Sequence, residues 1–252
     1  MIRPCHLLTT AAAALCLAAP APALELGDIL NAVTGAAQKV AKYQAAPLPK
    51  EKADAAMVFV GGMADEYTGI VHGLACNCPW LPITGDQTRA YYHWHMGDMG
   101  SFDLAPDKLA AELQEFRTLN PAAPVVLIGH SLGASTALQA AARLQGKPGG
   151  SIYLLTLDPV NRLVTPKRPD NLAWWGNSYI VNSQDSRDFI PVIGGRWNEC
   201  KEADYNIRMD GLAKDDYGYF YQHGGAMSQL FCKGDEQESL FTRLCREIKK
   251  AR

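Results

Sequence analysis

The chain has 252 residues, of which 48% are hydrophobic and 20% charged, and its formal net charge at pH 7 is −2. This length suffices for one large domain with a full hydrophobic core, whereas two compact domains would be crowded. The charge balance excludes a basic surface for a nucleic-acid backbone, and the apolar content excludes a disordered chain. The 22 glycines and 15 prolines are too few for a fibrous repeat.

The N-terminal segment has the features of a secretory signal peptide. Arg3 is its only charge, an apolar stretch covers residues 7–19, and the small residues at 21–23 fit a cleavage site. We therefore expect a signal peptide at 1–23 and a secreted or periplasmic protein. An N-terminal anchor that is never removed is the alternative interpretation.

The cysteine count follows from this expectation. The chain has seven cysteines, and cleavage after Ala23 leaves five of them: Cys76, Cys78, Cys200, Cys232 and Cys245. Because disulfides persist in an oxidising compartment, we expect two bridges and one free thiol. The sequence does not fix the pairing. We expect one bridge between Cys232 and Cys245 and another from the Cys76–Cys78 loop to Cys200.

The region that follows the signal peptide, 24–55, is expected to hold a helix and a linker. Apolar residues recur at helical spacing over 26–43, which predicts a helix docked on the outside of the domain. A proline-containing linker follows it. The main domain is then expected to cover 56–252.

Strand-like and helical segments alternate in the main domain. Strands are predicted at 57–60, 90–94, 124–128, 152–157 and 179–181, and helices at 106–119, 132–144 and 236–249. The 152–157 segment is apolar on both faces, as in a strand covered by helices on both sides. The alternation predicts an α/β fold with a mostly parallel sheet flanked by helices.

The strongest motif lies at residues 129–133. The apolar run 125–128 leads directly into Gly129-His130-Ser131-Leu132-Gly133, and a helix begins at once. This is the pattern G-x-S-x-G between a strand and a helix, where a tight turn exposes a serine nucleophile. The glycines are needed because a Cβ at either position would collide with neighbouring elements. We predict Ser131 as nucleophile and the Leu132 N–H as an oxyanion donor, with a merely structural turn as the alternative.

A second oxyanion donor is expected from the loop after an earlier strand. Gly61-Gly62-Met63-Ala64 directly follows the strand predicted at 57–60. Gly62 and Met63 are therefore the candidates. The simpler interpretation is that the paired glycines only turn the chain.

His223 is the candidate general base because it is the only histidine that follows Ser131 in the chain. It lies in a glycine-flanked loop suited to a catalytic side chain, although an ordinary surface histidine would also fit there. His130 is too close in sequence to reach the Ser131 hydroxyl and is expected to pack beneath the turn. His93 and His95 share one face of a predicted strand but lack a third ligand, so no metal site is predicted.

Three aspartates compete for the acid that would orient His223. Asp158 follows the 152–157 strand, whereas Asp185 and Asp188 follow the strand predicted at 179–181. Both places are carboxyl ends of strands, where a parallel sheet presents its site. Asp158 would also suit a plain turn before proline, and Asp185 a surface turn. The residues alone leave the choice open.

The 129–133 turn with its alanine-rich helix resembles the nucleophile elbow of the α/β-hydrolase superfamily, especially the class 3 lipases. In those enzymes the acid lies in a D-(I/V)-(I/V)-P segment, which Asp188-Phe189-Ile190-Pro191 resembles. The resemblance covers 56–225 and implies an α/β-hydrolase fold with a short lid. It also implies Ser131, Asp188 and His223 as a catalytic triad.

Part of the chain departs from that pattern. The turn Leu157-Asp158-Pro159 resembles the acid segment of pancreatic-type lipases instead, which keeps Asp158 as the alternative acid. The segments 76–80 and 194–197 match nothing in the lipases. In the lid region, Trp174-Trp175 would either line an acyl pocket or belong to the core. The aromatic residues of 217–221 would form one wall beside the histidine.

The resemblance implies a secreted serine hydrolase that cleaves carboxylic esters through an acyl-enzyme intermediate, with no cofactor. The expected substrate is a small-molecule or lipid ester, and no nucleic-acid partner is expected. Peripheral membrane contact and the oligomeric state stay open. Two alternatives also stay open: a thioesterase or amidase with the same triad, and a non-catalytic binding protein on the same scaffold.

Overall fold

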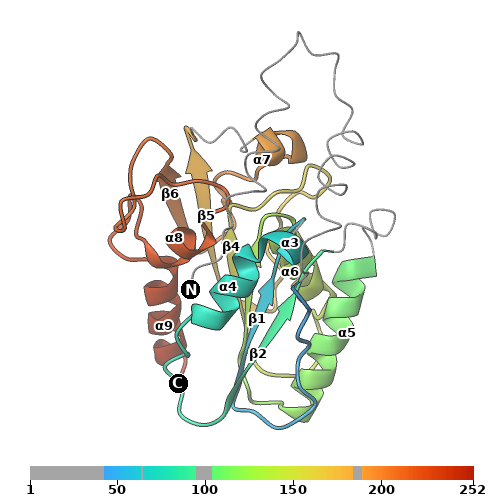
Figure 1. Cartoon of the computed structure of the whole chain (residues 1–252). Coiled ribbons are helices and arrows are strands. Elements are labelled where there is room, and N and C mark those ends of the chain that lie inside the picture. The colour runs from blue at the N-terminus through green and yellow to red at the C-terminus, as the bar shows by residue number, and fades with distance from the viewer. Residues whose placement is uncertain (1–42, 64, 95–103, 184–188) are drawn as a thin grey trace. The chain divides into compact units, whose positions relative to one another are not determined.

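A six-stranded parallel sheet forms the centre of the fold (Figure 1). The computed structural model describes residues 43–63, 65–94, 104–183 and 189–252, which belong to a single unit. The strands are β1 (Ala55–Val60), β2 (Gln87–Tyr92), β3 (Val125–His130), β4 (Ile152–Leu157), β5 (Leu172–Val181) and β6 (Tyr205–Asp210). Their order is β2-β1-β3-β4-β5-β6, and every neighbouring pair is parallel.

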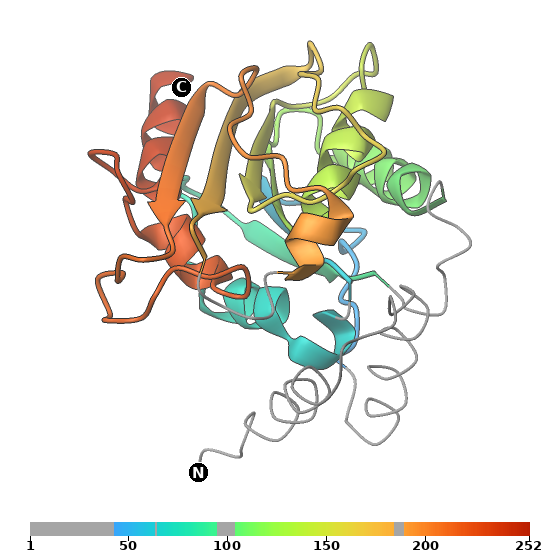
Figure 2. The ribbon, with the colours of Figure 1, turned by 90° about the horizontal axis from the view of Figure 1, so that it is seen from above.

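Helices cover both faces of this sheet (Figures 1 and 2). The helices are α3 (Asp65–Thr68), α4 (Ile70–Asn77), α5 (Leu104–Leu119), α6 (Leu132–Arg143), α7 (Phe189–Gly194), α8 (Ala226–Phe231) and α9 (Leu240–Lys250). The α5 and α6 helices pack on one face, and α4, α8 and α9 pack on the other. No helix within the described ranges combines the length and the apolarity that a membrane span requires.

The central strands explain why the sequence shows apolar runs rather than alternation. All residues of β1, β3 and β4 are buried. In β3, Val126 and Ile128 belong to the core on the α4/α8/α9 side, while Val125 and Leu127 belong to the core on the α5/α6 side. A strand covered on both faces has no polar side to show. The predicted α/β architecture is therefore confirmed.

Two of the differences between the predicted and observed element boundaries bear on residues singled out in the sequence. β5 begins at Leu172, so the strand predicted at 179–181 is only its end. Trp174 and Trp175 lie inside this strand, buried on opposite faces of the sheet, and the acyl-pocket interpretation of these tryptophans is wrong. β2 ends at Tyr92, which pairs with the last residue of β1, so His93 lies beyond the strand. His95 lies outside the described residues.

The expected disulfides are not formed: all five cysteines in the described part of the chain are free thiols. Cys78 belongs to the core on the α4/α8/α9 side, and Cys200 to the core on the α5/α6 side. The sheet separates them, so that predicted bridge is wrong. Cys232 lies by Asp216 and Cys245 lies near Cys78, and both are free thiols, so the second predicted bridge is wrong too. The predicted signal peptide and the predicted helix at 26–43 lie outside the described residues.

Candidate active site

Ser131 lies at the sharp turn between β3 and α6. Its φ of 57° and ψ of −129° fall where residues with a side chain are rarely found. Hydrogen bonds hold it there: its N–H donates to the Leu157 carbonyl at 3.0 Å, and its own carbonyl accepts from the N–H groups of Ala134 and Val160. The strained turn is thus fixed by its neighbours in the sheet and helix.

The two glycines of the motif make this turn sterically feasible. A Cβ on Gly129 would lie 2.5 Å from the Cα of Ala134, and one on Gly133 would lie 2.1 Å from the Val60 carbonyl oxygen. Both obstacles are backbone atoms that cannot move aside. The predicted reason for the glycines is confirmed.

His223 lies between β6 and α8, and its imidazole bridges Ser131 and Asp158. Its Nε2 is 3.0 Å from the Ser131 Oγ, and its Nδ1 is 2.7 Å from the Asp158 Oδ2. An ionised carboxylate can only accept, so Nδ1 carries the hydrogen and Nε2 accepts from the serine hydroxyl. We call these three residues the Ser–His–Asp cluster. Its geometry is that of a base positioned on a nucleophile.

Asp158 directly follows β4 and is completely buried. Its carboxylate accepts from the His223 Nδ1 and, at 3.3 Å, from the Ile180 N–H. Arg196 pairs with the same carboxylate, with Nη2 3.0 Å from Oδ2 and Nε 2.9 Å from Oδ1. Burial acts to raise the pKa of Asp158, but the contacts with His223, Arg196 and Ile180 outweigh it and hold the pKa below its usual value. Asp158 is therefore ionised at neutral pH.

Among the described residues, the acid on His223 is thus Asp158, the alternative acid of the sequence analysis. The favoured acid, Asp188, lies outside the described residues, as does Asp185. Strand register explains the position of Asp158: His130 pairs with Leu157 across β3 and β4, so the next residues, Ser131 and Asp158, emerge side by side. The signal in the sequence is an aspartate that ends a buried strand. This signal identifies the acid only when β4 is known to pair with β3, the strand that leads to Ser131.

The loop after β1 lies against the nucleophile. A Cβ on Gly62 would be 2.7 Å from the Ser131 Cβ and 3.1 Å from its Oγ. A side chain at this position would therefore fill the space over the serine, so Gly62 does more than turn the chain. Met63 follows in the same loop, and Leu132 is the first residue of α6. The oxyanion role of Leu132, Gly62 and Met63 stays a prediction.

His130 contacts the loop that carries the base. Its buried Nε2 donates to the His223 carbonyl at 2.6 Å, and the two rings lie 4.7 Å apart. Gln229 donates to the same carbonyl at 3.0 Å. Burial and the charge of His223 lower the pKa of His130 to about 3, so its ring is neutral. The sequence predicts that His130 packs beneath the turn but does not predict its contact with the His223 loop.

Four of the described cysteines, Cys78, Cys200, Cys232 and Cys245, do not offer a competing nucleophile. Burial raises the pKa of Cys78 and of Cys200 to about 12. Burial also raises the pKa of Cys232 and of Cys245. A thiol attacks only as its thiolate, so these four groups are unreactive near neutral pH.

Exposed apolar side chains lie on α7 and on the segment linked to it. Val192 and Ile193 of α7 are exposed, as is Leu163, and the neighbouring Arg162 N–H donates to the Gly194 carbonyl at the end of α7. This helix stands beyond the carboxyl ends of the strands (Figures 1 and 2). We call Leu163, Val192 and Ile193 the apolar rim.

The aromatic residues expected to form one wall before His223 divide into two environments. Tyr221 is buried in the core, whereas Tyr217, Tyr219 and Phe220 are largely exposed. The expectation of a single wall is therefore wrong.

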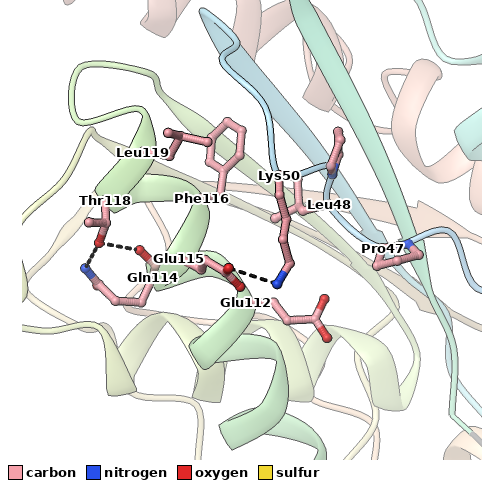
Figure 3. Close-up of a pocket in the computed structure, with 10 residues that line it drawn as sticks. Pro47, Leu48, Lys50, Glu112, Gln114, Glu115, Phe116, Thr118 and Leu119 are labelled. Carbon is pink, nitrogen blue, oxygen red and sulfur yellow. Dashed lines mark hydrogen bonds and ion pairs between the residues drawn. The ribbon is translucent and has the colours of Figure 1, made fainter.

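A separate pocket lies between the segment 47–50 and α5 (Figure 3). Lys50 and Glu115 form an ion pair there, with 2.9 Å between Nζ and Oε1. Leu48 and Phe116 supply apolar lining. None of the residues of the Ser–His–Asp cluster lines this pocket, so it is not the site of a reaction at Ser131.

Comparison with known families agrees with the fold and the elbow. A model of the alpha/beta hydrolase family matches residues 70–231, which is more than half of the chain. The chain belongs to the alpha/beta hydrolase family and is a hydrolase. The narrower resemblance to class 3 lipases is not confirmed by this match.

A comparison with solved structures matches the chain to the "putative cell surface hydrolase" from Lactobacillus plantarum WCFS1. It is 11% identical, and the match covers 71% of this chain and 90% of that chain with a TM-score of 0.36. At this identity and score, the assignment stands on the family match alone. No curated protein matches the chain.

Proposed function

We propose that the protein is a serine hydrolase that cleaves carboxylic esters through a catalytic triad of Ser131, His223 and Asp158. The observation that supports this function is the hydrogen-bond chain from Asp158 Oδ2 through the imidazole to Ser131 Oγ, with lengths of 2.7 and 3.0 Å. Each contact in this chain is required for base-assisted attack by a serine.

In the proposed reaction, His223 Nε2 takes the proton of Ser131 while Oγ attacks the ester carbonyl. Asp158 stabilises the imidazolium that forms, and backbone N–H groups near Leu132 and Met63 stabilise the oxyanion. The imidazolium then gives its proton to the departing alcohol, which leaves an acyl-enzyme. Water, activated by the same imidazole, releases the acid. These steps require only protein groups and water.

Substrate class is proposed from the surroundings of the cluster. Only the short segment 159–171 separates Asp158 from β5, which leaves little chain for a lid there. The apolar rim suits the acyl part of a small-molecule or lipid ester, and contact with a lipid surface would follow if the ester is a lipid. We also propose export through the signal peptide at 1–23. Cell fractionation and N-terminal sequencing of the exported protein test this, with Leu24 as the expected first residue.

The decisive experiment compares the full chain with Ser131→Ala on p-nitrophenyl butyrate. We expect the variant to lose roughly 10³-fold or more of kcat because no other group can form the acyl-enzyme. Ser135→Ala, a buried serine one turn further along α6, is the matched control and should stay active. Equal rates for wild type and Ser131→Ala would contradict the proposal.

Two further measurements separate this function from its alternatives. A fluorophosphonate probe should add its mass to the wild-type chain and not to Ser131→Ala, whatever the natural substrate. A chain without labelling or turnover would point to a non-catalytic binding protein. Butyryl esters, thioesters and anilides compared by kcat/KM test the ester assignment, which a faster thioester or anilide reaction would overturn.

A further inference from the structure

Arg196 is a second cation on the acid of the proposed triad. Its guanidinium meets both oxygens of Asp158, and its side chain is only 11% exposed. The Asp158 Oδ2 that accepts from His223 also accepts from Arg196. The serine–histidine–aspartate mechanism needs only one cationic partner for this carboxylate, the imidazolium, so the role of Arg196 remains to be explained.

The backbone around Arg196 is built to hold it in place. Residues 159–162 and 194–197 run antiparallel, with Val160 paired to Arg196. The N–H groups of Asn161 and Arg162 donate to the carbonyls of Gly195 and Gly194, and the Trp197 N–H donates to the Pro159 carbonyl. We call these two segments the clasp.

Gly195 allows the clasp to close. Its φ is 85°, and a Cβ there would lie 2.7 Å from the Cα of Arg162. The Trp197 Nε1 adds a further hydrogen bond, at 2.9 Å, to the Asn161 carbonyl. The clasp includes the segment 194–197 that has no counterpart in the lipases, and it fixes the guanidinium on a buried carboxylate.

We propose that Arg196 is a positioning residue that keeps Asp158 ionised and shares its charge, so that the Asp158–His223 pair stays free of an extra proton to lower pH. The activity readout of this inference rests on the proposed function. The expected consequence is that the hydrolase stays active at lower pH than it would if Asp158 had no contact with Arg196.

Two physical effects of removing Arg196 have the same sign. Without the guanidinium, the buried carboxylate loses a favourable charge and takes up a proton more readily. In addition, the full negative charge of Asp158 would act on the imidazole and favour its protonated form. Both effects make the pair bind a proton at higher pH, and a protonated pair cannot act as base.

Among the described residues, the Arg196 guanidinium and the His130 imidazole face the Asp158–His223 pair. The groups that act on Asp158 are His223, Arg196 and the Ile180 N–H. His130 faces the pair from the end of β3. Its ring is neutral, so it adds no charge to that of Arg196. The removal of Arg196 should therefore dominate the change in proton binding.

The test compares Arg196→Met, Arg196→Gln and Arg196→Lys in the full chain by the pH dependence of kcat/KM on p-nitrophenyl butyrate. The two neutral variants should move the acidic limb upward by about one pH unit. Arg196→Lys should restore most of the wild-type profile. Arg162→Met removes an exposed cation from the same clasp and should leave the profile unchanged.

A second readout does not depend on turnover. NMR of histidine-labelled protein follows the His223 ring signals against pH, with His223→Gln to assign them. The titration midpoint should rise in the neutral variants by the same amount as the kinetic limb. If the chain lacks esterase activity, this titration still decides the role of Arg196. Failure of the proposed function is therefore distinguishable from failure of the inference about Arg196.

Three outcomes would overturn the inference. One is an unchanged acidic limb and ring titration in folded Arg196→Met or Arg196→Gln. Another is a shift in Asp158→Asn/Arg196→Met relative to Asp158→Asn that equals the shift in the wild-type background, because Arg196 would then not act through Asp158. The third is that folded Arg196→Lys, which keeps the positive charge, moves the acidic limb upward by about one pH unit, because that charge would then not be what sets the limb.

Discussion

The proposed nucleophile and acid are positioned differently from the proposed base. Ser131 and Asp158 directly follow paired strands, and backbone hydrogen bonds to their neighbours hold both. His223 instead lies on a loop whose carbonyl is held by the side chains of His130 and Gln229. Register within a buried sheet leaves little freedom, whereas a loop held by side chains can be adjusted by single substitutions. Substitutions at the strand ends should therefore cause large losses of activity or stability in one step. Substitutions in the histidine loop should cause smaller, graded losses.

The largest effect is expected at the acid. Asp158→Asn should lower kcat on p-nitrophenyl butyrate by about 10⁴-fold, because an amide cannot stabilise the imidazolium and favours the wrong tautomer. Asp188→Asn should retain most of the activity. The resemblance to class 3 lipases predicts the reverse order, and finding it would move the triad.

Asp158→Asn also removes the negative charge that faces the buried guanidinium of Arg196. Its thermal unfolding should therefore be compared with that of Asp158→Asn/Arg196→Met, which removes both charges. A loss of kcat that persists in the more stable double variant belongs to the chemistry and not to misfolding.

The next largest effect is on the free energy of unfolding, and it compares a glycine at the strand ends with a glycine in the histidine loop. Gly133→Ala should destabilise the fold by about 3 kcal/mol, since the new Cβ would meet the Val60 carbonyl oxygen at 2.1 Å. Gly224→Ala, beside His223, should be tolerated because the nearest atom to its Cβ is the Ile70 Cδ1 at 3.6 Å. Urea unfolding of both variants measures the difference. Equal destabilisation would remove the contrast between the two regions.

The third prediction concerns pH and the histidine loop. The pKa of His130 is about 3 in the folded protein, against about 6.5 when unfolded, so below pH 6.5 only the unfolded chain takes up this proton. The free energy of unfolding should thus decrease as the pH is lowered below 6.5. The decrease is up to about 1.4 kcal/mol per pH unit, or about 2 kcal/mol between pH 6.5 and 5. The lowered pKa of Asp158 adds nothing in this window, since its contribution is lost only below about pH 3.8.

His130→Gln isolates the contribution of this group. The amide Nε2 can donate to the His223 carbonyl as the imidazole Nε2 does, but it does not titrate. Urea unfolding at several pH values should therefore give a flatter dependence in this variant. An identical slope in wild type and variant would mean that His130 is not the source.

The sequence predicted those features that depend on neighbouring residues. The elbow at Ser131 needs only a strand, a tight turn and a helix in succession, and the buried runs of β1, β3 and β4 reveal themselves by composition. The edge strand β6 was missed because half of its residues are part-buried and its sequence includes polar side chains.

The features that the sequence did not predict depend on long-range packing. The contact of Asp158 with His223 follows from the pairing of β3 with β4, and the role of Arg196 follows from a clasp between distant segments. The bridge expected from the Cys76–Cys78 loop to Cys200 was wrong for the same reason, since the sequence does not show that Cys78 and Cys200 belong to cores on opposite faces of the sheet.

The smallest expected effect tests the graded behaviour of the histidine loop. Gln229 is fully buried, and its Nε2 donates to the carbonyls of both Gln222 and His223. Gln229→Ala removes both hydrogen bonds, yet His130 still donates to the His223 carbonyl. The imidazole should therefore stay in the site but be oriented less accurately toward Ser131. We expect kcat to fall about tenfold, since small misplacements of a catalytic group are costly but partial, with little change in KM.

Gln139→Ala on α6 is the matched control, because it removes a part-buried glutamine that contacts Ser135 and not the histidine loop. Its kcat should equal that of wild type. A loss in Gln229→Ala as large as that in Asp158→Asn would show that this loop fails as abruptly as the strand ends. The side-chain donors would then be as indispensable to the site as the register of the sheet.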